Sequence, residues 1–153
     1  MSDREVVVTR KFGASPDVLW RWWTDPARIV RWWGPKGFRT TIDEMQVRPG
    51  GLWTHTMHGP DGTDYPSRAV FRDVVPPARL SYVLEGGTAA ERISCDVTWT
   101  FAPEGRGTVV TLCMLFPTVE ERDRAQHTFG VREAGVDTLN RLAALSERAP
   151  EAP

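Results

Sequence analysis

Short apolar runs separated by turn signals dominate the sequence, and their pattern predicts strands. The run REVVVTRKF, residues 4–12, is rich in β-branched side chains and predicts a first strand. Between Phe38 and Phe116, six more runs are divided by turns such as GPDG and PEGRG. Strands joined by short turns pair as antiparallel neighbours, so we expect a meander of six strands with the first strand added at one edge.

Helix signals follow the first strand twice. Ser15 can cap a helix, and Pro16 fits its first turn. Asp25 and Pro26 repeat the signal, so we expect two short helices, the first over about 16–24 and the second ending at Trp33. Five of the seven tryptophans lie in WRWWTDPARIVRWWGPKGF, within and just after these helices.

A third helical pattern closes the chain. Thr118 and Glu121 form a capping box, and the pattern stays helical to about Arg148. Gly130 and Gly135 interrupt it, but no turn residues surround them. We therefore expect one long helix in which two positions need small side chains.

Alternation within the strands places most apolar side chains on one face of the sheet. Closing a hairpin at EGRG pairs Trp99 with Leu112, and closing the looser GGTAAE pairs Tyr82 with Cys95. The run YPSRAVFRDVV indicates two conflicting inner faces, and a bulge within it would reconcile them.

A sheet that is apolar on one face must bury that face, and the long helix is its expected partner. On a helical wheel, the C-terminal half of the helix's apolar stripe is rich in leucine and typical of a core. The N-terminal half contains Thr128, Arg132 and Gly135 beside Phe129 and Val136. A hydroxyl, a charge and a missing side chain pack poorly, so we expect a cavity between the sheet and this half of the helix.

Composition and charge narrow the class of protein. The 153 residues predict a single domain, placed at 1–148, and a disordered tail at 149–153. The net charge of −1, with acids and bases interspersed, disfavours a nucleic-acid partner. No apolar run approaches the ~18 residues of a membrane span, and the N-terminus lacks a signal-peptide pattern. We expect a cytoplasmic protein with two reduced cysteines, as a monomer or homodimer.

The sequence contains no motif typical of a catalytic centre. It has no Gly-x-Ser-x-Gly, phosphate loop or dinucleotide fingerprint, so we expect no cofactor. His55 and His58 point to opposite faces of one strand and cannot share a metal ion, so we expect none. His55 is either a hydrogen-bonded histidine of the core or cavity, or a catalytic base. Arg132 pairs with an acid, extends to solvent or anchors a ligand, and we adopt the last hypothesis.

The order of elements resembles the START-like, helix-grip superfamily, and several motifs resemble its branch related to the activator of Hsp90 ATPase. The segment ASPDVLWRWWTDPARIVRWWGPKGF is similar to that branch's opening, VRPGGLWTHTMHGPDG to its Gly-Gly-x-Trp strand, and EAGVDTLNRLAAL to its closing helix. The resemblance implies an α+β fold. In the arrangement that the resemblance implies, a curved antiparallel sheet of six to seven strands wraps around the long helix, and the two short helices close one end with their tryptophans. Relatives often have Gly-Trp where this chain has Gly135-Val136, which implies a larger cavity.

Three classes of function remain, and we favour the binding of a small hydrophobic or amphipathic molecule in the cavity, in a carrier, sensor or sequestering role. The alternatives are a protein-interaction module of the Hsp90-activator type and an enzyme such as a cyclase or hydrolase, although no acid–base pair or nucleophile supports catalysis. The expected ligand-binding residues are Trp33, Trp53, His55, Met57, Phe71, Tyr82, Trp99, Thr128, Phe129, Arg132 and Val136.

Overall fold

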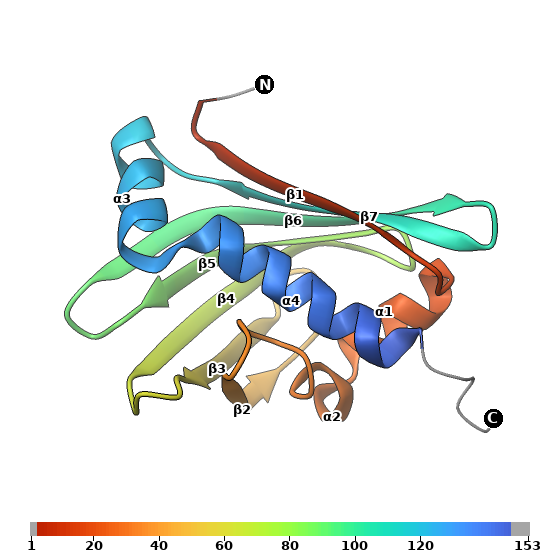
Figure 1. Cartoon of the computed structure of the whole chain (residues 1–153), viewed down its shortest axis with the longest axis horizontal. Coiled ribbons are helices and arrows are strands. Elements are labelled where there is room, and N and C mark those ends of the chain that lie inside the picture. The colour runs from red at the N-terminus through yellow and green to blue at the C-terminus, as the bar shows by residue number, and fades with distance from the viewer. Residues whose placement is uncertain (1–2, 148–153) are drawn as a thin grey trace.

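The computed structural model describes residues 3–147 and has an α+β architecture (Figure 1). The predicted tail at 149–153 lies outside the described residues. The elements, in chain order, are β1 Glu5–Phe12, α1 Pro16–Thr24, α2 Pro26–Ile29, β2 Arg39–Met45, β3 Leu52–His58, β4 Asp64–Val75, β5 Arg79–Gly87, β6 Arg92–Glu104, β7 Gly107–Leu115, α3 Val119–Phe129 and α4 Val131–Ser146.

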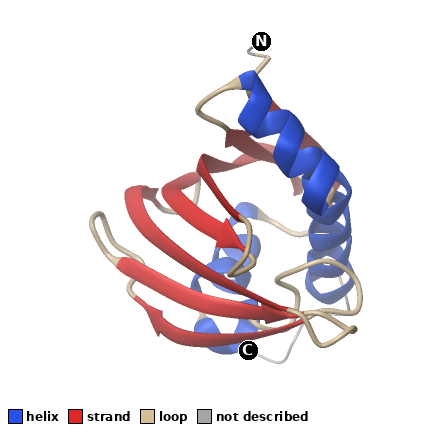
Figure 2. Ribbon diagram, turned by 90° about the vertical axis from the view of Figure 1, so that its left-hand side faces the viewer, coloured by secondary structure: helices blue, strands red, loops and turns tan. Residues whose placement is uncertain are grey.

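All the strands belong to one antiparallel sheet of seven, in the order β1-β7-β6-β5-β4-β3-β2. This confirms the predicted meander with the first strand added at an edge, where β1 pairs with β7. The sheet curves, and the helices lie on its concave side (Figure 2). The arrangement is the helix-grip fold implied by the resemblance, with the apolar core between the sheet and the helices.

The predicted pairing register is correct for one hairpin and wrong for another, and the difference lies in the turns. Trp99 lies opposite Leu112 in the β6–β7 pair, as predicted. Tyr82, however, lies opposite Val97 rather than Cys95, because β5 includes both glycines of GGTAAE and the loop is correspondingly short. The prediction was wrong by two residues, a shift that leaves every side chain on its predicted face.

Strand β4 contains a bulge, as its two conflicting apolar faces predict. Its pairing with β5 shifts register between Phe71 and Val74. Ala69 and Phe71 are fully buried before the shift, and Val74 packs against the core after it. The bulge therefore lets both halves of the strand direct apolar side chains inward.

The prediction of one long C-terminal helix was wrong, because the chain breaks at Gly130 into α3 and α4. Gly130 has φ 58° and ψ 48°, a left-handed conformation that glycine adopts without steric cost. The side chain of Gln126 stabilises the new helix start: its Oε1 accepts a hydrogen bond from the N–H of Arg132 at 2.9 Å, and its Nε2 donates to Glu133. Beyond the break, α4 crosses the concave side of the sheet (Figure 1).

Gly135 explains how closely α4 approaches the sheet. A Cβ atom at this position would lie 3.3 Å from Val8 of β1 and 3.4 Å from Leu112 of β7. The absence of a side chain thus brings α4 against the β1–β7 edge, and this need for a small residue agrees with the prediction.

The two short helices carry the tryptophans to the concave face. Ser15 caps α1 by accepting a hydrogen bond from the N–H of Val18 at 3.3 Å. Helix α2 is shorter than predicted: it ends at Ile29, and a turn continues to Trp33, whose N–H donates to the Ile29 carbonyl at 2.9 Å.

An aromatic plug fills the concave face beneath these helices. Its centre is Trp23, which is fully buried. The ring centroid of Trp23 lies 5.2–6.1 Å from those of the other plug residues, Trp33, Trp53, Phe71, Tyr82 and Trp99. Most of these contacts are edge-on, and such contacts add to the free energy gained by burying the rings.

The helix break can be tested by the sign of one substitution. Gly130→Ala is expected to lower the free energy of unfolding by about 1–2 kcal/mol, because a Cβ atom is unfavourable in a left-handed residue. Gly130→Asn is the matched control and should lose less, since asparagine tolerates this conformation. Urea denaturation measures both. A gain of about 1 kcal/mol on Gly130→Ala, as in a continuous helix, would contradict the break.

Candidate ligand-binding site

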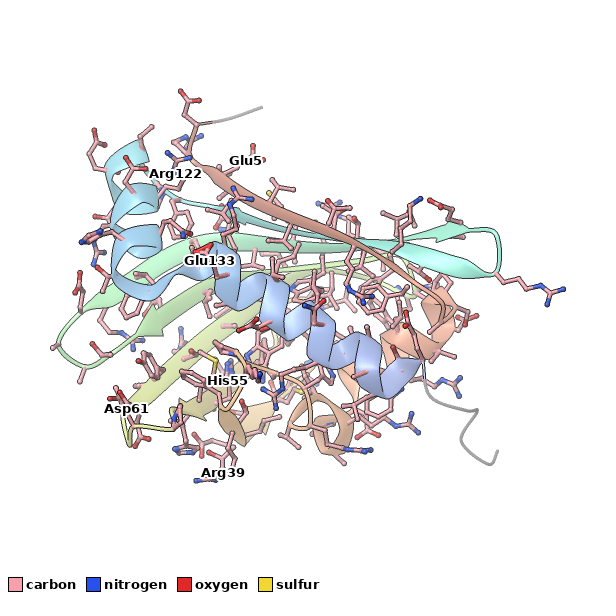
Figure 3. All side chains as sticks on the ribbon, viewed as in Figure 1. Glu5, Arg39, His55, Asp61, Arg122 and Glu133 are labelled. Atoms are coloured by element: carbon pink, nitrogen blue, oxygen red, sulfur yellow. The ribbon has the colours of Figure 1, made fainter. Side chains whose placement is uncertain are left out.

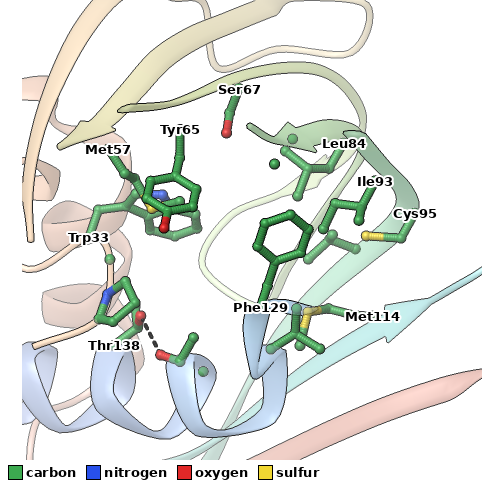
Figure 4. A pocket seen from close by; sticks show the side chains of 18 of the residues that line it. Trp33, Met57, Tyr65, Ser67, Leu84, Ile93, Cys95, Met114, Phe129 and Thr138 are labelled. Carbon is green, nitrogen blue, oxygen red and sulfur yellow. Dashed lines mark hydrogen bonds between the residues drawn. The ribbon is translucent and has the colours of Figure 1, made fainter. Parts of the chain in front are cut away.

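A pocket of about 250 Å³ lies between the concave face of the sheet and the first half of α4. Strands β3 to β7, the loop after α2, the end of α3 and the start of α4 contribute to its walls (Figure 4). The predicted site residues among its lining are Trp33, His55, Met57, Tyr82, Trp99, Thr128 and Phe129.

Two predicted site residues lie on the expected face but deeper than the pocket. Trp53 and Phe71 are buried in the aromatic plug, with their rings stacked at an interplanar angle of 11°. They do not line the pocket, and they support the wall formed by Trp33, Tyr82 and Trp99.

The prediction that Arg132 and Val136 face the pocket was wrong. Val136 is 42% exposed, and Arg132 is also exposed, with its Nη1 donating to the Val7 carbonyl oxygen on edge strand β1 at 2.9 Å. A helical wheel that runs through Gly130 assumes one continuous helix, whereas the first helix ends at this residue. Residues after the break therefore have a different phase, in which Gly135 and Thr138 face inward.

The pocket is also lined by residues that were not predicted, most of them small, aliphatic or weakly polar. They include Tyr65, Ser67, Leu84, Ile93, Cys95, Met114, Val131 and Thr138. Strand alternation could have found some of them. Tyr65, Ser67, Ala69 and Phe71 follow at intervals of two along β4, so the first two share the inward face of the last two.

His55 is a buried, neutral histidine in the pocket wall. Its Nε2 accepts a hydrogen bond from the Trp33 indole N–H at 3.1 Å, which assigns the ring proton to Nδ1. The ring stacks on Trp53 with centroids 4.1 Å apart. Burial lowers the pKa of His55 from 6.5 to about 3. This supports the hydrogen-bonded alternative over a catalytic base, because the only lone pair of the ring is already engaged.

Two further titratable side chains of the pocket, Tyr82 and Cys95, also stay neutral. Tyr82 accepts a hydrogen bond from the Trp99 indole N–H at 3.2 Å, and burial raises the pKa of its phenol. Burial also raises the pKa of the Cys95 thiol to about 12, so Cys95 is a poor nucleophile. Among residues 3–147, no Asp, Glu, Lys or Arg lines the pocket. The pocket therefore favours an uncharged, apolar ligand over a charged one.

Arg141 of α4 fixes the loop at one side of the pocket. Its Nη1 donates to the carbonyl oxygens of Trp33, Gly34 and Pro35 at 2.9–3.2 Å. Partial burial lowers the pKa of the guanidinium. These hydrogen bonds hold the backbone on both sides of Gly34, and with it the position of the Trp33 ring.

Arg124 of α3 holds the structure at the opposite side of the pocket. Its guanidinium contacts the carboxylates of Glu121 at 2.6 Å and Glu91 at 3.0 Å and donates to the Arg92 carbonyl oxygen at 2.8 Å. Hydrogen bonds to Glu121 and Glu91 raise the pKa of Arg124. Thr128 donates to the same Glu91 carboxylate at 3.3 Å. This network joins α3 to the β5–β6 loop beside the pocket.

Within residues 3–147, no group of three or more His, Cys, Asp and Glu side chains is placed to hold a metal ion. None of the helices in that range is long and apolar enough to cross a membrane.

The family model for activator of Hsp90 ATPase homolog 1-like proteins (AHSA1) matches residues 13–147. The chain belongs to this AHSA1 family. No curated protein matches the sequence significantly. The family assignment agrees with the motifs quoted above from the opening helices, the Gly-Gly-x-Trp strand and the closing helix.

Solved structures share the fold of this AHSA1-family chain. Protein Ms6760 from Mycobacterium smegmatis is 23% identical, with a TM-score of 0.86 over 97% of this chain and 94% of that one. A protein from Arthrobacter aurescens is 21% identical, with a TM-score of 0.87 over 99% and 90%. The AHSA1 protein SPO3351 from Silicibacter pomeroyi is 22% identical, with a TM-score of 0.74 over 92% and 95%. At these identities the likeness shows the fold alone.

The lowered pKa of His55 predicts how stability depends on pH. Between pH 6.5 and about 3, the unfolded chain binds a proton at His55 that the folded AHSA1 domain excludes. This contribution to stability is therefore lost as the pH falls, by about 1.4 kcal/mol per pH unit. Urea denaturation of wild type and His55→Phe from about pH 6 to 4.5 should show a steeper loss in wild type by this amount. Parallel curves would contradict a buried, neutral His55.

Proposed function

We propose that this AHSA1-family protein binds a small, predominantly apolar molecule in the pocket between the sheet and α4. The observation that carries the proposal is a pocket of about 250 Å³ whose walls are largely aromatic and aliphatic and to which the described part of the chain contributes no charged side chain. Pockets of this composition typically bind small molecules through apolar contact, with a few polar groups that set orientation. A carrier, sensor or sequestering role would use the same site.

The construction of the walls supports a preformed site. Trp33 and Trp99 belong to the aromatic plug and pack against its central residue Trp23, and Arg141 holds the loop that carries Trp33. Rings packed against one another in this way do not collapse into a neighbouring space without losing their own contacts. A ligand that enters a preformed pocket loses less of its binding free energy to ordering the protein.

The protein-interaction alternative has less support on the described surface. Its exposed large apolar residues, Val75, Val119 and Val136, lie on three different elements, β4, α3 and α4. Isolated apolar side chains of this kind are ordinary on a protein surface, whereas a docking site needs a contiguous patch. The name of the family refers to an Hsp90 activator, but this chain offers no such patch among residues 3–147.

Naphthalene is a suitable first probe because it is apolar, rigid and uncharged. We expect wild type to bind one molecule per chain in a calorimetric titration of protein into naphthalene. Ala134→Phe places a ring at a half-buried position of the pocket wall and should weaken binding at least about tenfold by occupying the space. Val136→Phe adds the same ring on the exposed face of α4 and is the matched control, with unchanged affinity.

Two outcomes would contradict the proposed function. One is an absence of binding to wild type, and the other is an equal loss of affinity in the two phenylalanine variants.

A further inference from the structure

Ser67 places a hydroxyl in the largely apolar wall of the pocket. Ser67 is only 7% exposed, and its side chain makes no hydrogen bond within residues 3–147. Figure 4 shows the oxygen directed from β4 into the pocket. A hydroxyl that faces an apolar pocket and has no partner in the protein is free to hydrogen-bond a ligand, so this position favours a ligand with a polar group beside Ser67.

The neighbouring strand keeps the space beside this hydroxyl open. Gly86 of β5 lines the pocket, and a Cβ atom there would lie 3.5 Å from Ser67 Oγ and 3.9 Å from the side chains of Leu84 and Ile93. Any larger residue at position 86 would fill the volume in front of the hydroxyl. Because Gly86 is not in a left-handed conformation, its backbone alone does not require glycine.

The strand on the other side supplies a second donor. His55 lies directly opposite Ser67 in the β3–β4 pair. Its Nδ1 is buried and has no hydrogen-bond partner, and this atom carries the ring proton because Nε2 accepts from Trp33. Directly opposed residues on one face have Cβ atoms about 4.5–5.5 Å apart, so a rotation of Ser67 would let its Oγ accept from Nδ1. The hydroxyl proton would then point to the ligand.

No charge accompanies this polar pair. Within the described residues, the pocket lining has no acidic or basic side chain apart from the neutral His55, and the guanidinium of Arg141 is bound to the carbonyl oxygens of the loop beside the pocket. Labelled charged residues such as Arg39, Asp61 and Arg122 lie at the periphery of the molecule, whereas His55 lies within it (Figure 3). An ionised ligand group would lose its hydration without gaining a counter-ion.

We propose that Ser67 is the polar anchor of this pocket and that the ligand is an uncharged, ring-containing molecule whose carbonyl oxygen accepts a hydrogen bond from the Ser67 hydroxyl. This proposal rests on the proposed function, since it names the chemical class that the same pocket takes. It assigns to Ser67 the anchoring role that the sequence analysis expected of Arg132.

The test compares three probes that share one ring system: naphthalene, 2-acetylnaphthalene and 2-naphthoate. In wild type, the ketone should bind about fivefold more tightly than naphthalene, the equivalent of one net hydrogen bond of about 1 kcal/mol. The carboxylate should bind at least about a hundredfold more weakly than the ketone, because its charge would be buried unpaired. Calorimetry measures all three affinities.

Serine variants separate the anchor from the pocket. Ser67→Ala should remove the preference for the ketone and leave the affinity for naphthalene. Ser81→Ala is the matched control: Ser81 is also a serine of 7% exposure, but its hydroxyl interacts with Asp73 away from this pocket, so the ketone preference should remain. Gly86→Ala is a second variant that leaves Ser67 intact, and its methyl group in front of the hydroxyl should also reduce the ketone preference.

Each contrary result has its own meaning. An unchanged ketone preference in Ser67→Ala and Gly86→Ala overturns the anchor while the proposed function stands. Equal affinity for carboxylate and ketone overturns the uncharged class. If naphthalene itself does not bind to wild type, the proposed function fails, and the anchor fails with it.

Discussion

The packing of Trp23 against the concave face of the sheet is the contact on which the rest of the structure depends. A curved sheet with one apolar face needs a cover, and α4 approaches it closely along the β1–β7 edge, where Gly135 lacks a side chain. Trp23 and the plug fill the face beneath α1 and α2. The plug is made of rigid rings, which cannot spread into the space further along the sheet, and that space is the pocket.

Trp33 joins the plug to the pocket. Its ring lies in edge contact with Trp23, its indole N–H is bound to His55, and its carbonyl oxygen accepts from Arg141. The hydrogen bond to Nε2 keeps the proton of His55 on Nδ1, on the side chain opposite Ser67. One tryptophan thus connects the stability of the fold with the polarity of the candidate site, and burial of the imidazole keeps that site neutral.

Local sequence signals predicted most of the fold, and long-range geometry limited the rest. The β6–β7 register follows from the tight turn between those strands, whereas the loop GGTAAE does not define where its strands end. The low helix propensity of Gly130 predicts only a weak point within a helix. The helix ends there because Gly130 adopts a left-handed cap conformation, which the side chain of Gln126 supports. Carrying the helix phase across that break misplaced Arg132 and Val136. Alternation identifies the inner face of a strand, but it cannot say which inward residues, such as Trp53, lie in the plug.

The central claim is that one end of the concave face admits an uncharged apolar guest while the other end is closed by the plug. Methyl spectra of ¹³C-labelled protein, recorded with increasing naphthalene, test it most directly. The account predicts that methyl signals of Ile93, Met114 and Val131 shift and that those of Leu19 and Ile29, buried at the other end, do not. Shifts at Leu19 and Ile29 without shifts around the pocket would contradict it.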